Sequence, residues 1–403
     1  MTKVSLDQLV EELLAADDFL IVQDIDGVCI PLVKDPLTRK ISSGYIHAVV
    51  ALKGHFMVLT NGEHEGRRGV NRLVEQALGD PFDRPIKEGL YLPGLAAGGV
   101  QLQDRFGMIS HAGVSAEEIK FLASLPERMI NLLDQKLATL MPNLSEEHRR
   151  AQVKLAVLDT QLSPTINLNG LFNLIPDDLN AQYLLQLMLK ELMNSLLDEA
   201  DNAGLKNSFF LHVAPNLGDD GQQERLKPPV SGDVGTTDIQ FMLRGALKEA
   251  GLLVLINQHI ANRFGDYPFG PNFNARTAPH NHDELLALAE SKIKAEQMPL
   301  LVGVGDTVTS NNCELTGEWL RGGSDRKFLH LIQDLGELFG RNNRVVLVDS
   351  SGGEVDRPSL QSSQLVGVSD PDDPLSFDVI ISTGPSGYVE WFCDFAKRFA
   401  LQH

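Results

Sequence analysis

A short apolar run that ends in two carboxylates constrains the fold of this chain most strongly. Phe19-Leu20-Ile21-Val22 is typical of a buried strand. Asp24 and Asp26 follow at the carboxyl end of that strand, and Gly27 lets the chain turn away. In open α/β sheets, ligands bind at this edge. The segment therefore predicts an α/β fold with a functional site at the end of its first strand.

Two further predicted strands also end in polar side chains. Met57-Val58-Leu59 is followed by Thr60, and the strand that ends at Gly305 is followed by Asp306. Because the carboxyl ends of parallel strands lie at one edge of a sheet, we expect Asp24, Thr60 and Asp306 to meet. A single aspartate after a strand is common in turns. Three polar strand ends in this order indicate a shared site.

The segment Asp24-Ile25-Asp26-Gly27-Val28 resembles motif I (DxDGx) of the haloacid-dehalogenase-like phosphatases, and Gly305-Asp306 resembles their motif IV. The resemblance implies an enzyme that hydrolyses a phosphate monoester. Asp24 is then the nucleophile that forms an aspartyl-phosphate. Asp26 is expected to protonate the leaving alkoxide and then to activate water.

The resemblance also implies a Mg²⁺ cofactor, which prefers hard oxygen ligands. The expected protein ligands are Asp24, the backbone carbonyl of Asp26, and Asp306. The family places a second acid four or five residues after the motif IV aspartate, but Ser310 and Asn311 stand there in this chain. We predict that Asn311 takes this place by orienting a metal-bound water, and a hydrogen bond within its own turn is the alternative.

The phosphate group is expected to contact Thr60 and the backbone at Asn61. The family also uses a lysine at the start of the helix before the motif IV strand, and no lysine stands at that place here. His282 is closest to the position and is the predicted phosphate-binding cation. Lys248, or another residue of the insert, is the alternative.

Strands and helices alternate at both ends of the chain, which predicts a parallel sheet flanked by helices. The predicted fold class is α/β, a Rossmann-like core with an inserted α/β cap domain. Residues 1–111 and 266–403 are expected to form the catalytic core and residues 112–265 the cap. The cap is predicted to contain a strand over 154–158, a loop over 216–235, a helix over 237–250 and a strand over 252–256.

The position of the insert resembles the C2-type cap of sugar-phosphate phosphatases. Gly98-Gly99-Val100 with Asp104-Arg105-Phe106-Gly107 is similar to the strand-hairpin of trehalose-phosphate and sucrose-phosphate phosphatases. Over its full length the chain resembles the glucosylglycerol 3-phosphate phosphatases, which make an osmolyte for salt tolerance. The resemblance implies 2-O-(α-D-glucosyl)glycerol 3-phosphate as the substrate, and the synthase of this precursor as a pathway partner.

Three alternatives stay open. The first is a phosphatase for trehalose phosphate or sucrose phosphate, the second a sugar phosphomutase, and the third a catalytically silent regulatory subunit with the same fold. The missing lysine and second acid favour the third, but the intact Asp24, Asp26, Thr60 and Asp306 weigh against it. Cap residues that could hold sugar hydroxyls include Asn167, Asn169 and His212.

The composition excludes some classes of partner. The net charge of −19 argues against a nucleic-acid partner, which requires a basic surface. No run approaches the ~18 consecutive apolar residues of a membrane span, and the acidic N-terminal region is not a secretory signal. The three widely spaced cysteines fit no disulfide framework or zinc pattern. We therefore expect a cytoplasmic protein.

Overall fold

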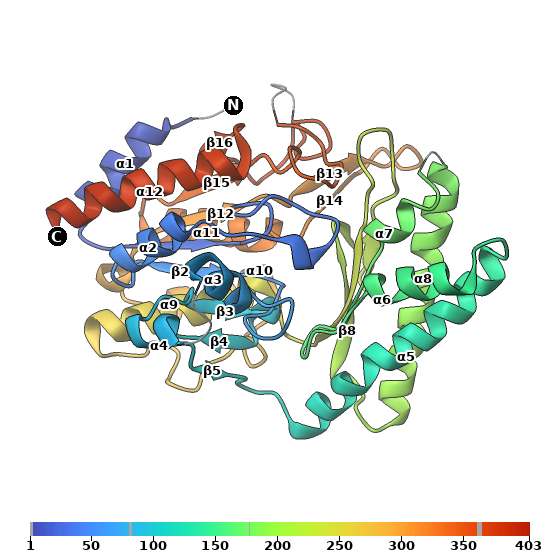
Figure 1. Cartoon of the computed structure of the whole chain (residues 1–403). Helices are drawn as coiled ribbons and strands as arrows, with labels where there is room; N and C mark the ends of the chain where they lie inside the picture. The colour runs from blue at the N-terminus through green and yellow to red at the C-terminus, as the bar shows by residue number, and fades with distance from the viewer. Residues whose placement is uncertain (1–2, 80–82, 177, 361–364) are drawn as a thin grey trace.

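The core of the protein is an eight-stranded sheet (Figure 1). The structure is a computed structural model that describes residues 3–79, 83–176, 178–360 and 365–403. The first six strands in the order below are parallel, the seventh pairs antiparallel with the sixth, and the eighth pairs antiparallel with the seventh. The central strands are apolar along their length because helices bury both faces of the sheet. The strand order is β16 (Val379–Ile381), β15 (Arg344–Val348), β12 (Leu300–Gly305), β1 (Phe19–Gln23), β2 (Phe56–Leu59), β3 (Gly94–Ala96), β4 (Gln101–Gln103) and β5 (Ile109–Ser110).

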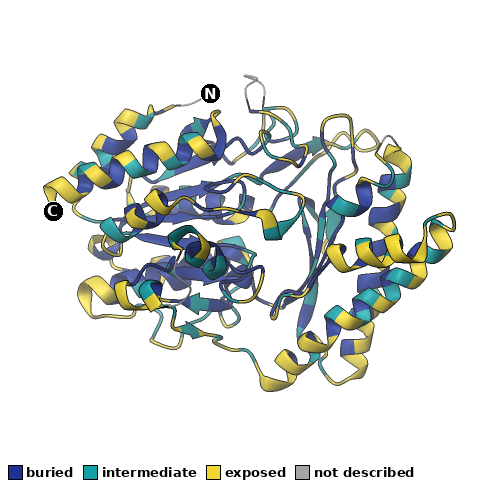
Figure 2. Cartoon of the chain, in the orientation of Figure 1, coloured by how far each residue is buried: buried dark blue, intermediate teal, exposed yellow. Residues whose placement is uncertain are grey.

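Helices cover the two faces of this sheet and bury a separate apolar cluster on each (Figure 2). One face is covered by α1 (Leu6–Ala15), α2 (Ser43–Ala51), α3 (Val70–Leu78) and α12 (Gly384–Gln402). The other is covered by α9 (Lys248–Phe264), α10 (His282–Lys292) and α11 (Arg326–Phe339). The short α4 (Asp83–Glu88) precedes β3, and 3₁₀ turns occur at Pro36–Thr38, Ala97–Gly99 and Ala295–Gln297. No helix in the described part of the chain is long and apolar enough to cross a membrane.

The insert between β5 and α9 forms a second α/β unit with its own apolar cluster. Its antiparallel sheet has the order β6 (Val157–Leu158), β7 (Thr165–Asn167), β11 (Asp238–Leu243) and β8 (Phe209–Ala214). It also contains α5 (Ala116–Leu140), α6 (Glu146–Ala156), α7 (Asn169–Phe172), α8 (Leu179–Asn202) and the hairpin of β9 (Asn216–Asp219) and β10 (Glu224–Leu226). The predicted α/β core with an inserted α/β cap is confirmed.

Several elements predicted for the cap are wrong. The predicted helix over 237–250 contains strand β11, and the predicted strand over 252–256 lies inside helix α9. The run Leu252–Ile256 is apolar without a break because α9 is buried on all sides, so it shows no helical periodicity. The predicted strand over 154–158 is mostly the end of α6, and the predicted loop over 216–235 contains the β9–β10 hairpin.

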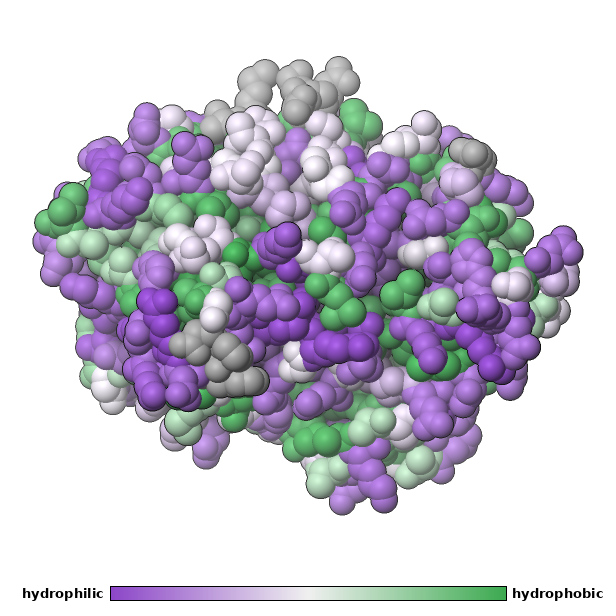
Figure 3. Space-filling view, in the orientation of Figure 1, coloured by the Kyte–Doolittle hydropathy of each residue, from purple (hydrophilic) through white to green (hydrophobic). Residues whose placement is uncertain are grey.

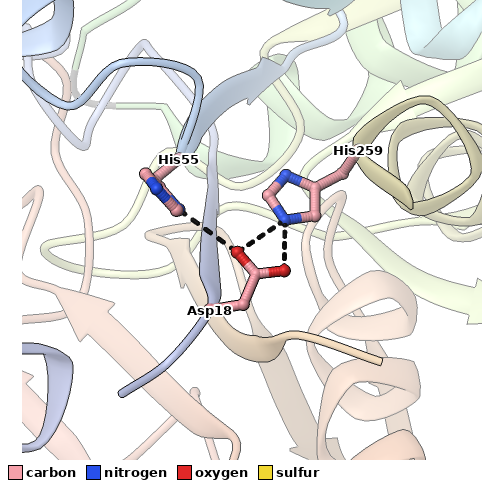
Figure 4. A group of neighbouring side chains, drawn as sticks. All are labelled: Asp18, His55 and His259. Atoms are coloured by element: carbon pink, nitrogen blue, oxygen red, sulfur yellow. Dashed lines mark hydrogen bonds and ion pairs between the residues drawn. The ribbon is translucent and has the colours of Figure 1, made fainter. Parts of the chain in front are cut away.

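Helix α9 packs on the core, although it falls in the range predicted for the cap. It contributes to the apolar cluster that contains β1, β2 and β12 residues. Asp18 directly precedes β1, at the amino-terminal edge of the parallel strands, and lies between His55 and His259 (Figure 4). His259 Nε2 is 3.0 Å from Asp18 Oδ2, and Arg263 Nε is 3.3 Å from Asp18 Oδ1. We therefore propose that the cap ends near Leu247 and that α9 belongs to the core.

We predict that Asp18→Ala lowers the free energy of unfolding of the core by about 1–3 kcal/mol, because buried His259 and the Arg263 guanidinium lose their shared acceptor. Urea denaturation measures the change. The matched control is Asp17→Ala, at an exposed neighbouring position. Equal stability of the two variants would contradict this role for Asp18.

Candidate active site

Three strand ends meet at one edge of the core sheet. Asp24 follows β1, Thr60 follows β2, and Asp306 follows β12. The strands are held in register, and the backbone N–H of Asp24 donates to the carbonyl of Val304 at 3.0 Å. Asp24 and Thr60 are both buried. The parallel topology thus brings together residues that are far apart in the sequence.

Lys248 supplies a buried ammonium to this site. It is the first residue of α9, and its Nζ is 2.5 Å from Asp24 Oδ2 and 2.7 Å from Asp325 Oδ1. Burial alone would lower the pKa of Lys248, but the charges of Asp24 and Asp325 raise it above its ordinary value. Lys248 is therefore a fixed cation, and the start of α9 adds the partial positive charge of a helix N-terminus.

Burial raises the pKa of Asp24 to about 6, although the nearby Lys248 ammonium acts in the opposite direction. Asp24 Oδ1 accepts the backbone N–H of Ile25 at 2.7 Å, which fixes the carboxylate. Its second oxygen faces Lys248. A carboxylate held in this way is oriented to act as a nucleophile.

Asp325 is the second acid of the site, and the sequence analysis missed it. It lies immediately before α11, where it is fully buried, and its Oδ2 accepts the backbone N–H groups of Asp306 and Thr307, both at 3.0 Å. The hairpin of β13 (Thr309–Asn312) and β14 (Trp319–Gly322) stands between Asp306 and Asp325 in the sequence. The acid is therefore present, but 19 residues after Asp306 instead of four or five.

The Asp306 carboxylate lacks partners of its own. Both of its oxygens are buried, and neither has a hydrogen-bond partner within residues 3–79, 83–176, 178–360 and 365–403. Burial, together with the charges of Asp325 and Asp24, raises the pKa of Asp306 well above its usual range. Gly27, at φ +82°, leaves room for this carboxylate, since a Cβ at Gly27 would lie 2.1 Å from Asp306 Oδ2.

The three acids form a set of oxygen atoms that could hold a divalent cation. One carboxylate oxygen from each of Asp24, Asp306 and Asp325 lies within 4.8 Å of the others. When all three carboxylates are ionised, the single positive charge of Lys248 neutralises only one of their three negative charges. Carboxylate oxygens are the ligands that Mg²⁺ prefers, and a bound cation would satisfy the unpartnered oxygens of Asp306.

Two predicted site residues do not join this cluster. His282 Nε2 is 2.7 Å from Asp334 Oδ2, and its ring stacks on His330 at a centroid distance of 4.7 Å. His282 therefore lies outside the carboxylate cluster, and the ammonium beside Asp24 belongs to Lys248, the alternative cation from the sequence.

Asn311 is also displaced from its predicted place as a metal ligand. It lies in β13 and pairs with Leu320 across the hairpin, and its buried side-chain oxygen has no partner among the described residues. Asp325 occupies the position beside Asp306 that Asn311 was predicted to fill. The predicted part of Asn311 in orienting a metal-bound water stays a prediction.

Asp26 and Asn61 line the cleft next to this cluster. Arg39 Nη1 is 2.7 Å from Asp26 Oδ2, and the Asp26 side chain is 34% exposed. The Asn61 side chain lies 2.9 Å from His212 Nε2 of the cap. The Thr60 hydroxyl accepts the backbone N–H of Gly62 at 3.3 Å, which shapes the loop after β2.

A cleft of about 1060 Å³ opens between the core cluster and the cap sheet. The alternation of side chains along β7 and β11 places polar residues on the cleft side, while Ile166, Ile239 and Phe241 enter the apolar cluster of the cap. The cap residues on the cleft side are Thr165, Asn167, Asp238 and Gln240, with Asn169 nearby. The side-chain oxygen of Gln240 is buried without a partner among the described residues.

The face of the molecule seen in Figure 3 is mainly hydrophilic, with small hydrophobic areas scattered over it. The free cysteines Cys29, Cys313 and Cys393 form no disulfide. Several buried polar side chains line the cleft.

We predict that Asp306→Asn raises the free energy of unfolding by about 1–3 kcal/mol in the presence of a chelator, because it removes one of three buried carboxylates that share one ammonium. Thermal and urea denaturation measure the change. Added Mg²⁺ should raise the melting temperature of the unmodified protein more than that of the variant.

The control for this prediction is Asp198→Asn, at an exposed position on α8. If Asp306→Asn is less stable than the unmodified protein in chelator, the Asp306 carboxylate stabilises the fold without a bound cation. That result would contradict the view that three buried carboxylates beside one ammonium are destabilising.

Comparison with known proteins agrees with this geometry. The chain matches the glucosylglycerol-phosphate phosphatase family over residues 18–396. It is 47% identical over 400 residues to a glucosylglycerol-phosphate phosphatase of Synechocystis sp., covering 96% of this chain and 94% of that protein.

Two solved structures are similar at low identity. The C-terminal domain of trehalose-6-phosphate phosphatase from Candida albicans is 11% identical with a TM-score of 0.48, covering 98% of each chain. The C-terminal domain of the trehalose synthase regulatory protein from the same organism is 9% identical with a TM-score of 0.46, covering 98% of this chain and 99% of that one. By its sequence, the chain belongs to the glucosylglycerol-phosphate phosphatase family.

Proposed function

We propose that this protein hydrolyses 2-O-(α-D-glucosyl)glycerol 3-phosphate to glucosylglycerol and phosphate. The observation that carries the proposal is the buried cluster of Asp24, Lys248, Asp306 and Asp325 under a polar cap cleft, in a chain of this family. The other sugar phosphates considered from the sequence become competing substrates in the test below.

The first step is attack of an Asp24 oxygen on phosphorus. The bond between phosphorus and the glycerol oxygen breaks, and Asp26 gives its proton to that oxygen. In the second step Asp26 takes a proton from water, the water oxygen attacks phosphorus, and the bond to Asp24 breaks to release phosphate. Asp26 suits both transfers because it lines the cleft and is partly exposed, with Arg39 fixing its carboxylate.

Lys248, Thr60 and the backbone at Asn61 stabilise the transferring phosphoryl group. The Lys248 ammonium already contacts Asp24 and lies where phosphoryl oxygens gather during attack. The Thr60 hydroxyl is buried beside the nucleophile. These groups are fixed before substrate binds, so little reorganisation is needed in the transition state.

The donor set of the site fits Mg²⁺, and Asp24, Asp306 and Asp325 would hold it. When bound, Mg²⁺ neutralises the charge of the phosphate so that an anionic nucleophile can approach. The unpartnered oxygens of Asp306 support this proposal.

The polar side of the cap sheet is the proposed contact for the glucosyl group. Asn167 Nδ2 donates to Asp238 Oδ1 at 2.9 Å, and Thr237 Oγ1 donates to Asp238 Oδ2 at 2.9 Å, so Asp238 is already partnered. Gln240 has a free buried oxygen that can accept a sugar hydroxyl. Among the described cap residues that line the cleft, Gln240 is the one whose buried side-chain oxygen has no partner.

The proposed setting is the cytoplasm, where the cysteines stay reduced. The substrate there would come from the synthase of glucosylglycerol phosphate, which we propose as the metabolic partner. No direct contact between the two proteins is required by this proposal.

We predict Mg²⁺-dependent release of phosphate from glucosylglycerol phosphate, with at least about tenfold lower kcat/KM for trehalose phosphate and sucrose phosphate. Asp24→Asn should lower kcat by at least about 10³-fold, because it removes the nucleophile. Phosphate release with and without chelator measures both effects.

The control for this test is Asp283→Asn, at an exposed position on α10. Preference for another sugar phosphate would overturn the substrate, and activity that survives in Asp24→Asn would overturn the mechanism.

We predict that Gln240→Leu raises KM for glucosylglycerol phosphate by about tenfold, the cost of one lost hydrogen bond to the sugar. Hydrolysis of p-nitrophenyl phosphate, which carries no sugar, should stay within about twofold. Gln135→Leu, at an exposed position on α5, is the matched control. An equal loss on both substrates would show that Gln240 supports the fold instead of the sugar.

A further inference from the structure

A chain of three side chains links the loop after β2 to the cap. Asn61 Nδ2 of the core is 2.9 Å from His212 Nε2 of β8 in the cap. His212 Nδ1 is 3.0 Å from Glu224 Oε1 of β10. Asn61 and His212 are 151 residues apart, so this contact exists only while cap and core are together.

Glu224 sets the hydrogen-bonding role of His212. Its carboxylate accepts the backbone N–H of Val213 at 2.9 Å and the side-chain amide of Asn216 at 3.2 Å, so it is fixed within the cap. A carboxylate facing His212 Nδ1 requires a proton on that nitrogen. The Asn61 amide nitrogen can only donate, and the lone pair of His212 Nε2 therefore accepts from it.

The same contact separates two cavities. Asn61 lines the substrate cleft, and it also lines a second cavity of about 550 Å³ that contains His212, Glu224 and Lys248 in its wall. The hydrogen bond between Asn61 and His212 is therefore made by a side chain that lines both cavities.

A second residue of the same loop is also bound to the cap. Glu63 is buried, and its carboxylate accepts the backbone N–H groups of Gln161, Leu162 and Ser163 at 2.7–2.9 Å. The loop from Thr60 to Glu63 is thus held to the cap at two points.

We propose that His212, oriented by Glu224, is a positioning residue that couples cap closure to the phosphate-binding loop through Asn61. This inference rests on the proposed function, in which the backbone at Asn61 contacts the transferring phosphoryl group. The closed cap fixes the Asn61 side chain, and the backbone beside Thr60 takes its productive position only then. The chemistry is in this way limited to enzyme whose cleft is closed over substrate.

The test compares two replacements of His212. His212→Leu removes the acceptor for Asn61, whereas His212→Gln keeps an oxygen near the position of Nε2. We expect His212→Leu to lower kcat for glucosylglycerol phosphate by about 10- to 100-fold, with KM within about threefold, because a small misplacement of the loop slows chemistry without removing a sugar contact. His212→Gln should recover most of kcat, and His148→Leu, at an exposed cap position, should match the unmodified enzyme.

A double-mutant cycle with Asn61→Ala completes the kinetic test. If His212 acts through Asn61, the double variant is no slower than Asn61→Ala alone. Fully additive losses, or kcat within twofold of normal in His212→Leu, would overturn the proposal.

Amide hydrogen exchange tests the coupling without activity. In His212→Leu, exchange at residues 60–63 and 161–163 should be at least about tenfold faster than in the unmodified protein and in His148→Leu. Unchanged exchange would overturn the coupling. An unmodified protein that is inactive on every sugar phosphate would instead overturn the proposed function, and the exchange result would still decide the coupling.

Discussion

The buried Lys248 ammonium between Asp24 and Asp325 is the interaction on which the rest of the site depends. It joins the end of β1, the start of α9 and the start of α11, which are distant in the sequence. Without this cation, three carboxylates would be buried close together with no compensating charge, which is costly. Two contacts keep Lys248 in place: α9 packs on the core sheet, and His259 in the second half of α9 contacts Asp18.

Much of the fold follows from local sequence patterns. The apolar strands β1, β2 and β12 are recognisable because both of their faces are buried, and the parallel order then brings their polar ends to one edge. Asp24, Thr60 and Asp306 were predictable for this reason. Their meeting requires only strand patterns and the rule for parallel sheets.

The rest of the site was hidden by two physical effects. The first half of helix α9 is buried on all sides, so Leu252–Ile256 has the uniform apolarity of a buried strand, and Lys248 was predicted only as the alternative cation and not as a helix start. Asp325 was hidden because a hairpin separates it from Asp306. One available signal was the segment Ser324-Asp325 directly before the amphipathic helix α11, which is typical of a helix start.

In the proposed function, the cap both selects the sugar and controls the position of the loop after β2. Its sheet turns polar residues toward the cleft and apolar residues into its own core, so one strand pattern serves binding and folding at once. Asn61 and Glu63 both contact the cap, and in the proposed mechanism these contacts make the loop after β2 sensitive to closure. Exclusion of water and arrangement of the catalytic groups would then occur in a single motion.

The most direct test of the central claim is a crystal structure of the protein with Mg²⁺ and beryllofluoride, a mimic of a phosphoryl group on a carboxylate. We predict beryllium bonded to an Asp24 oxygen, Mg²⁺ held by Asp24, Asp306 and Asp325, and Lys248 in contact with fluoride. Beryllofluoride on another residue, or a cation bound without Asp306, would contradict it.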